Sequence, residues 1–432
     1  MKNHIKIWFV AVGAILMVLF AMIPASTTLS LFTLPLVEEF GVSRTEVSLM
    51  FSISSFTGIF AALAIGPVLK KVSPKIVVVV AGCSFIIYFL TLGLANSMMP
   101  IYIAVVFKGI CGIFAGMSMG QIVMAQWFKK GRGTLMSVIS IAIAAAGAAA
   151  MGSFAFAIQS LGYRTVAIGE ALIFGALIIL IGIFCIDDAP EKIGYKPYGY
   201  EEAPAAPAVT EEKAVKPADE KPSLGLKRIL GFPSFWLLAV VTLLGSLSTT
   251  VFTTHGSPFF QSLGLDPVGA GLAMSVWQFA GMGWSLLFGL LSDKKGVGVA
   301  TIVCGGGFAV AMFGAVIWTG WIGAIIAAIL IAAGGTLSTL IGPLLTTNLF
   351  GTKEAGSLIG FTRSASSVGA VIGPLFAGAI FDFTQSYTLC LEIVGVFAVI
   401  IIIFTLWAGG KKARENIQRK IDELAAQEEA AI

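Results

Sequence analysis

Long apolar runs alternate with short polar segments along almost the whole chain. A helix needs roughly 20 apolar residues to cross a hydrocarbon core of about 30 Å, and twelve runs are long enough. They lie near residues 7–29, 46–69, 76–95, 100–127, 134–159, 164–186, 233–254, 267–291, 299–318, 321–349, 357–381 and 386–408. The pattern predicts an all-α membrane protein with twelve transmembrane helices.

The basic residues of the loops orient these spans. With the N-terminus inside the cell, 23 of the 27 Lys and Arg residues fall on the cytoplasmic side, and only Arg44 and Arg164 fall outside. The other two, Lys108 and Arg363, lie within spans. Cytoplasmic loops carry such an excess of positive charge. We therefore expect a multi-pass protein of the cytoplasmic (cell inner) membrane with both termini in the cytoplasm.

One long polar segment, residues 187–228, divides the chain into two sets of six spans. It is rich in Ala, Pro, Glu and Lys and has no apolar periodicity, which is typical of a flexible linker. We therefore expect a six-helix bundle over residues 1–186, this cytoplasmic linker, and a second bundle over residues 229–409. Apolar residues at helical spacing predict a short amphipathic tail helix over residues 410–432.

The two halves of the chain repeat. A shift of 223 residues places Gly58 on Gly281 and Gly112 on Gly335, and it overlays the loops that follow the second span of each half. Transporters built from two repeated bundles hold their substrate between the repeats, near the middle of the bilayer. The repeat therefore indicates a transporter with a central site.

Composition excludes several classes of function. Hydrophobic residues make up 57% of the chain and charged residues 12%, against about 25% charged residues in soluble domains. The net charge of +4 lies in the loops that set topology, so we expect no nucleic-acid partner. Five isolated cysteines and two histidines offer no metal cluster, and no catalytic or nucleotide-binding motif is present. We expect no enzyme activity, no metal and no cofactor.

Several short motifs carry a family resemblance. GLLSDKKG (289–296) resembles the G-x-L-x-D-[RK]-x-G loop of the major facilitator superfamily, and GVSRTEVSLMFS, LGYRTV and SSVGAVIGPLFAGAIFDFTQSY are similar to its helix-boundary patterns. The resemblance covers nearly the whole chain and implies the major facilitator fold, with twelve helices in two six-helix bundles. The start of the second span, LVEEFGVSRTEVSLMFSI, is most similar to the oxalate–formate and monocarboxylate branch.

The resemblance also implies a gate. In this family the loop acid pairs with basic residues and with the dipole of a neighbouring helix, and it holds the bundles together on the cytoplasmic side in the outward-open state. The gating set corresponds here to Gly289, Asp293, Lys294 and Gly296. The first half has Lys70 where the acid should be, so its copy of the lock is weakened or absent. The alternative is that Asp293 only caps a helix turn.

Lys108 is a candidate substrate ligand because it lies deep in the fourth span, in AVVFKGICGIFAGMSMG. A Lys or Arg near the centre of a membrane helix costs roughly 2.5–3.5 kcal/mol on insertion scales, so it marks function by default. Many members of the resembling family carry a basic residue here, ahead of a glycine-rich run. We predict that Lys108 lines a central cavity. The alternative is a lysine that snorkels to the outer interface.

Arg363 in the eleventh span is the second candidate. Ser366 and Ser367 follow it on the same helical face, which indicates a wet cavity. A guanidinium can bind a carboxylate through two parallel hydrogen bonds, and the alternative is an internal salt bridge or a carbonyl contact. The resembling branch implies a further cation on the eighth span, where this chain has only neutral polar residues such as Gln278. A monoanion, or a weakly polar acid, therefore fits better than a dianion such as oxalate.

Three further residues are candidates for a coupling proton. Glu170 and Glu392 lie about two turns inside the outer ends of the sixth and twelfth spans, where partial burial favours the protonated form. The alternative is an interfacial carboxylate, or one paired with Arg164. His255 lies near the outer end of the seventh span, and histidine titrates close to neutral pH. Its alternative is a satisfied interfacial histidine.

These observations predict a secondary transporter that moves a small, monocarboxylate-like organic anion by alternating access, as proton symport or anion exchange. The predicted substrate site contains Lys108, Arg363, Gln278 and Ser366. Its partners are the anion, the lipid bilayer and protons, and we expect a monomer. Two alternatives are a multidrug or other small-solute efflux pump and, from another class, a transport-inactive membrane sensor with the same fold.

Overall fold

Helices form almost all of the computed structural model, which describes residues 2–128, 132–199, 229, 231–315, 317–350, 355–410, 413–420 and 423. The first half contains α1 (Lys2–Met22), the π-helical turn η1 (Ile23–Thr27), the 3-10 turn η2 (Leu29–Phe32), α2 (Thr33–Phe40), α3 (Arg44–Lys71), α4 (Pro74–Leu94), α5 (Met98–Phe114), α6 (Met117–Trp127), α7 (Arg132–Leu161), α8 (Tyr163–Phe184) and the 3-10 turn η3 (Pro190–Ile193). The second half contains α10 (Pro233–Ser262), α11 (Pro267–Lys295), α12 (Val297–Gly314), α13 (Gly320–Phe350), α14 (Ala355–Thr384) and α15 (Thr388–Ala408).

Helix boundaries follow local chemistry. Pro74, Pro233 and Pro267 lie in the first turns of α4, α10 and α11, where the missing N–H of proline has no intrahelical partner to lose. Gly41 ends α2 at φ +61° and Gly296 ends α11 at φ +87°, backbone conformations that favour glycine. Short turns of this kind return each helix directly into the membrane.

Twelve spans are long and apolar enough to cross a bilayer, which confirms the predicted architecture. Two of them are interrupted. The first span runs over Ile5–Phe40 through η1 and η2, and the fourth breaks between α5 and α6. At the second break, a Cβ on Gly116 would lie 1.9 Å from the carbonyl oxygen of Gly112. Only glycine fits at Gly116, so the helical face that carries Lys108 ends there.

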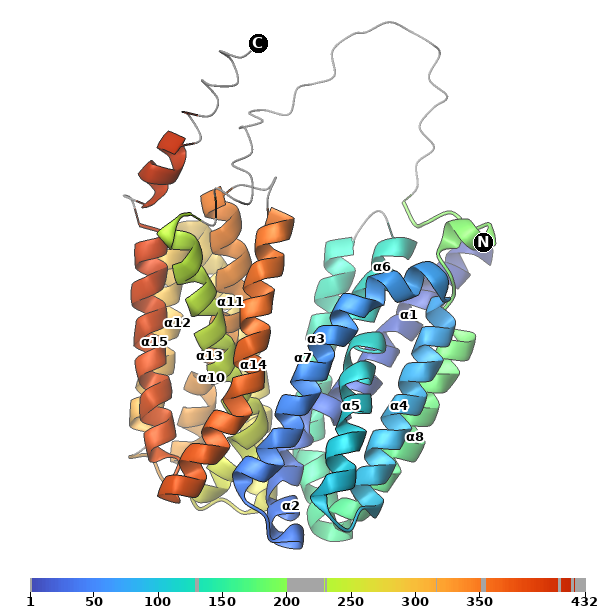
Figure 1. The fold of residues 1–432 in the computed structure, drawn as a ribbon, viewed down its shortest axis with the longest axis horizontal. Helices are drawn as coiled ribbons and strands as arrows, with labels where there is room; N and C mark the ends of the chain where they lie inside the picture. Colours follow the sequence, from blue (N-terminus) through green and yellow to red (C-terminus); the bar gives the residue numbers. More distant parts are fainter. Residues whose placement is uncertain are drawn as a thin grey trace, which may run out of the picture.

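The helices form two bundles that stand side by side, α1–α8 and α10–α15 (Figure 1). The bundles diverge toward the end that carries the N-terminus and approach each other at the opposite end, and we call these the open end and the closed end. Across the interface, α3 packs against α14 and α7 packs against α11. Helices α3 and α14 are the second and eleventh spans, and α7 and α11 are the fifth and eighth. The internal repeat relates the second span to the eighth and the fifth to the eleventh, so it maps one contact onto the other.

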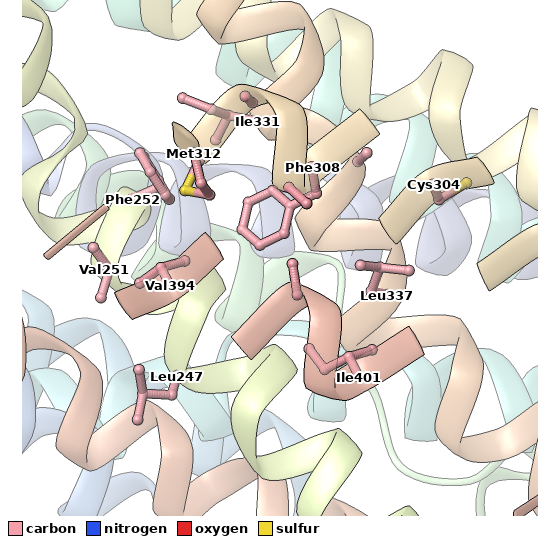
Figure 2. Packing of buried hydrophobic residues seen from close by; sticks show 14 of the residues in the cluster. Leu247, Val251, Phe252, Cys304, Phe308, Met312, Ile331, Leu337, Val394 and Ile401 are labelled. Carbon is pink, nitrogen blue, oxygen red and sulfur yellow. The ribbon is translucent and has the colours of Figure 1, made fainter. Parts of the chain in front are cut away.

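Each bundle has a hydrophobic core, and Leu31, Met151 and Ala155 of the N-terminal bundle join the core of the C-terminal one. In the C-terminal bundle, Phe308 of α12 lies among Leu337 of α13 and Ile401 of α15 (Figure 2). A Cβ on Gly334 would lie 2.6 Å from the Phe308 ring, so the ring and α13 are in close contact. Because each bundle buries most of its core residues within itself, the two can move as units relative to one another.

Residues 187–199 pack against the N-terminal bundle. Asp187 forms an ion pair with Lys6 at 2.8 Å, and the Tyr198 N–H donates to the Trp127 carbonyl at 2.9 Å. The sequence predicts this segment as the start of a flexible linker, and the contacts here lie with the start of α1 and the end of α6. The remainder of the expected linker lies outside the described residues.

The expected tail helix is present over residues 413–420. Ile417 is 2% exposed and packs on the core of the C-terminal bundle. The helix is therefore anchored to the protein by one apolar side chain. Residues 424–432 lie outside the described part of the chain.

A glycine pair on α14 tests how closely the helices must approach. A Cβ on Gly369 would lie 2.3 Å from the Leu243 carbonyl oxygen and 2.9 Å from the Leu247 nitrogen, which are backbone atoms of α10. Gly369→Ala should therefore destabilise the protein by about 1–3 kcal/mol, as overpacking does. Gly360→Ala is the matched control, because a Cβ there meets open space. Thermal unfolding of the two variants should differ; equal melting temperatures would contradict the close contact.

Candidate functional site

A polar cavity of about 290 Å³ lies in the C-terminal bundle among α10, α13 and α14. Among the described residues of its lining, Arg363 is the one that carries a charge, and most of the others carry a hydroxyl group. The lining comprises Thr242, Ser246, Ser338, Thr339, Gly342, Pro343, Thr362, Arg363, Ser366, Ser367 and Ala370. The structure thus brings two predicted substrate ligands, Arg363 and Ser366, into one cavity.

Several hydroxyl groups of this cavity donate hydrogen bonds to backbone carbonyls. Ser338 and Thr339 donate to Gly335 O at 2.9 and 3.0 Å, and Ser367 donates to Arg363 O at 3.0 Å. A hydroxyl has one donor and two acceptor lone pairs. These side chains therefore keep acceptor capacity for a solute that brings its own O–H or N–H groups.

Arg363 is exposed and forms no ion pair with any described residue. The alternative of an internal salt bridge is therefore not found within the described chain. Ser366, one turn later, donates to Thr242 O at 3.4 Å and so joins α14 to α10. The guanidinium is left free for a solute, with its five donors in a planar fork.

Lys108 lies outside this cavity, in the N-terminal bundle. Its Nζ donates to Ser54 Oγ of α3 at 3.0 Å, and the helices are close here because a Cβ on Gly109 would lie 2.7 Å from Ser54 O. Ten residues separate Lys108 from Met98 at the start of α5, which is about 15 Å along a helix. The ammonium group therefore contacts a neighbouring hydroxyl, well inside the span from its start at Met98.

Gln278 also lies outside the cavity. It is half-buried on α11 where that helix meets α7, and a Cβ on Gly147 would lie 3.1 Å from Gln278 Nε2. The amide thus occupies the second interface between the bundles. No described contact joins it to Lys108 or Arg363, so the four predicted ligands are not assembled in one place in this conformation.

The two candidate glutamates differ in their surroundings. Glu170 is 2% exposed, and neither carboxyl oxygen has a hydrogen-bond partner among the described residues. Glu392 is exposed, one turn from the start of α15. Neither glutamate forms an ion pair with Arg164, whose described ionic partner is Glu39 at 2.9 Å. Glu170 therefore remains a buried acid, and Glu392 an interfacial one.

The predicted gating loop lies at the open end, where α11 ends. Gly289 faces open space, and Gly296 turns the chain at φ +87°. Asp293 and Lys294 are exposed, and neither forms an ion pair with a described residue. In this conformation the loop does not tie the bundles together.

At the closed end, Asp382 of α14 caps α3 of the other bundle. Its carboxylate accepts the N–H groups of Arg44 at 3.0 Å and Thr45 at 2.8 Å, and the Thr45 hydroxyl at 2.5 Å. The other two donors, the N–H groups of Ser43 and Glu46, are satisfied by the capping box that these two residues form. A helix start has four N–H groups without intrahelical acceptors, and α3 thus obtains half of its acceptors from the opposite bundle.

The Arg44 side chain adds a second contact across the interface. Its Nη1 donates to the Tyr387 hydroxyl at 2.5 Å, and its guanidinium carbon lies 3.4 Å from the centre of the Phe381 ring. Burial raises the pKa of Tyr387, so this hydroxyl keeps its hydrogen and remains a donor. Cation–π contacts strengthen when water is excluded, and this one is partly buried between the bundles.

His255 of α10 completes the closed end. It is 1% exposed; Nε2 lies 2.8 Å from Ser48 Oγ and 3.2 Å from Pro374 O, and Nδ1 lies 3.0 Å from the Tyr387 hydroxyl. The imidazole therefore contacts both bundles. One of the two predicted alternatives was a histidine whose hydrogen bonds are satisfied at the lipid interface. Its described partners lie instead on neighbouring helices and on the segment before α15, and one of them is the backbone carbonyl of Pro374.

Sequence reasoning missed Arg44, Asp382 and Tyr387 as functional candidates. In the sequence, the segments that contain these residues resemble helix boundaries and show no binding motif. Arg44 was counted as one of two basic residues outside the membrane, and an isolated charge at a helix start gives no sign of its partner. Asp382 lies 338 residues away in sequence, and only the three-dimensional structure pairs them.

Comparison with known proteins identifies the family to which this architecture belongs. The family model of the Major Facilitator Superfamily matches residues 14–347. Monocarboxylate transporter 14 of Mus musculus is 35% identical over 83 residues, which are 19% of this chain and 16% of the relative. The Homo sapiens protein is 32% identical over 97 residues, 22% of this chain and 19% of the relative. The chain thus matches less than a fifth of the length of these curated relatives.

Solved structures resemble the whole chain. A D-xylose–proton symporter has a TM-score of 0.71 at 15% identity, covering 93% of this chain and 97% of that one. A nucleoside transporter has a TM-score of 0.71 at 12% identity, with coverage of 93% and 98%. A bacterial homolog of the human lysosomal transporter Spinster, inward-facing and unoccupied, has a TM-score of 0.66 at 14% identity, with coverage of 97% and 98%. Identities this low establish the fold alone.

The cap across the bundles gives a matched pair of substitutions. Asp382→Asn removes the charge and one acceptor from the α3 cap, and should weaken closure by about 1–2 kcal/mol, or roughly 5- to 30-fold in the equilibrium. Asp266→Asn alters a cap of the same kind within one bundle, where Asp266 accepts from the Gly269 N–H at 3.2 Å, and should leave closure unchanged. Spin-label distances across the closed end report the equilibrium; an equal effect of both substitutions would refute the cross-bundle cap.

Proposed function

Since the chain belongs to the Major Facilitator Superfamily, we propose that it is a secondary transporter that carries a small organic monoanion across the cytoplasmic membrane by alternating access. The observation that carries the proposal is Arg363, a cation without a described ionic partner in a hydroxyl-lined cavity of the C-terminal bundle. A membrane-embedded cation of this kind is retained for a task. Binding an anion is the task that suits a guanidinium.

The chemistry of the lining residues limits the class of anion that the cavity suits. One guanidinium neutralises one carboxylate, and no second cation lines the cavity among the described residues, so a dicarboxylate would keep an unpaired charge in the membrane. The lining hydroxyls offer lone pairs, which suit substrate O–H groups. A hydroxylated monocarboxylate satisfies both features. The short likeness to monocarboxylate transporter 14 supports the same class.

Lys108, in the opposite bundle, would attract the anion along its path through the protein. Its ammonium group lies well inside the span and is half-buried, and a neutral hydroxyl, Ser54 Oγ, is its described partner. When the bundles rock about the closed end, α5 and α14 approach the same central space. Lys108 would then attract the same carboxylate as it moves to or from Arg363, because attraction rises steeply at short range in a low dielectric.

The charge pattern of the loops orients the transporter. Basic residues gather at the open end, which carries the N-terminus and the end of α8 (Figure 1), and positive loops mark the cytoplasmic side. The structure then corresponds to an inward-open conformation, and the closed end faces outward. Energy would come from a proton or an exchanged anion, with the buried Glu170 as one candidate for the proton site.

The substrate class is tested by ligand-induced stabilisation. Purified protein is heated with monocarboxylates, 2-hydroxy monocarboxylates, dicarboxylates, sugars and cationic drugs. A hydroxy monocarboxylate at a hundred times its Kd should stabilise the protein by about 2.7 kcal/mol. Arg363→Gln should abolish the shift, while Arg419→Gln, a surface arginine paired with Glu423, should retain it. Stabilisation by cationic drugs alone would replace the proposal with a multidrug pump.

Uptake into cells then tests the two cations together. Lys108→Gln and Arg363→Gln should each lower uptake of the stabilising acid at least tenfold at equal membrane abundance, and Lys108→Arg should keep partial activity because the charge survives. If both cations contact one anion, the double variant loses less than the two single losses combined. Normal uptake by Lys108→Gln would remove the lysine from the path.

Topology is tested by labelling single cysteines in a background without the five native ones. Ala205→Cys, in the linker, should react with a membrane-impermeant maleimide only after permeabilisation, because the basic loops hold that side in the cytoplasm. Leu161→Cys, 63% exposed at the end of α7, should react in intact cells. The reverse pattern would invert the assignment of the open end.

A further inference from the structure

The hydrogen bonds around His255 form a closed ring. Arg44 Nη1 donates to the Tyr387 hydroxyl, which lies 3.0 Å from His255 Nδ1. On the other side of the imidazole, Nε2 lies 2.8 Å from Ser48 Oγ, and Ser48 Oγ donates to Arg44 O at 2.6 Å. The ring begins at the Arg44 side chain and returns to its backbone, and it crosses the bundle interface twice.

One arrangement of protons satisfies this ring. The Pro374 carbonyl, 3.2 Å from Nε2, can only accept, so Nε2 carries a hydrogen, which it shares between Pro374 O and Ser48 Oγ. The Tyr387 hydroxyl oxygen accepts from Arg44, and its own hydrogen needs an acceptor, which a bare Nδ1 provides. The imidazole is thus neutral in the closed ring, with its tautomer fixed by its neighbours.

A second proton on His255 would break the arrangement. An Nδ1–H would point at the Tyr387 hydroxyl, which would then face two donors and lose the acceptor of its own hydrogen. The added charge would also lie near the Arg44 guanidinium. The Tyr387 hydrogen would have no acceptor, and the Arg44–Tyr387 hydrogen bond, which crosses the interface, would be strained with it. Buried polar groups without partners are costly.

The other ionisable groups near the ring do not relieve this conflict. Asp382 of α14 is the nearest acid, but its oxygens already accept three hydrogen bonds from the start of α3. Cys390 of α15 follows Tyr387 by one turn and is a neutral thiol. Glu38 of α2 is exposed and lines a separate small pocket. No described carboxylate lies within ion-pair distance of the imidazole.

We propose that His255 is a proton-binding site that is accessible only when the closed end opens, and that a bound proton holds this end open. An imidazole in contact with water titrates near pH 6.5, whereas the closed ring admits the neutral form alone. Acid in the solution on that side therefore favours the open form, and closure recovers as the pH rises through this value. The inference concerns the equilibrium between conformations and does not depend on the identity of the transported solute.

Spin labels across the closed end test the site without substrate. Met99 at the start of α5 and Ile322 at the start of α13 are 66% and 77% exposed, and cysteines there carry the labels in a cysteine-free, full-length protein in nanodiscs. One proton with a pKa of about 6.5 in the open form should raise the open-to-closed ratio about tenfold between pH 7.5 and pH 5.5. No change in the unsubstituted histidine background would overturn the proposal.

Substitutions assign the effect to one residue. His255→Gln cannot take up a proton in this range, yet its amide offers one acceptor and one donor group, so its distance distribution should be the same at both pH values. His4→Gln alters the only other histidine in the chain and should keep the tenfold change. A pH response that survives His255→Gln, or is lost in His4→Gln, would refute the assignment.

A direct titration covers the case in which His255→Gln does not fold. In the His4→Gln protein, His255 is the only imidazole, so 13C-labelled histidine gives signals from this side chain alone. The open-form signal should titrate near pH 6.5, while the closed-form signal should remain that of a neutral imidazole. A closed-form signal that becomes protonated would overturn the proposal even if transport of a monocarboxylate is established.

Discussion

Asp382 holds together the end of the molecule about which the two bundles can move. Helix α3 begins at the closed end with two backbone donors that find acceptors only on this carboxylate. Within a membrane every backbone polar group needs a partner from the protein or from water that the protein admits. Separation of the bundles therefore requires water to replace Asp382 at the start of α3, so opening and hydration of this end are one event.

The rest of the closed end follows from this contact. With the start of α3 fixed against α14, Arg44 lies over the Phe381 ring and Ser52 donates to the Val371 carbonyl at 2.6 Å. Gly378 allows the approach, because a Cβ there would lie 2.7 Å from Ser48 Oγ. The open end has no comparable contact among the described residues, and its gating loop is free. The bundles are therefore joined at one end, and the polar cavity lies in the C-terminal one.

Apolar run length predicted the number of spans, and the repeat of loops predicted two bundles, because both depend on short-range pattern and bilayer thickness. The break at Gly116 and the docking of residues 187–199 escaped prediction, since each depends on one close backbone contact or on distant aromatic partners. Arg363 with Ser366 was predictable from helical spacing. The pairing of Arg44 with Asp382 was not, because no local pattern identifies a cap that comes from the opposite bundle.

The prolines inside α13 and α14 have a consequence for how a solute leaves its cavity. Pro343 and Pro374 have no N–H, so the carbonyl groups of Thr339 and Ala370, four residues earlier, lack their usual helical donors. Both of these residues line the cavity. Such a wall binds water strongly, so the cavity fills as soon as a solute departs. Release is then an exchange of solute for water, and its rate depends on how quickly the wall is rehydrated.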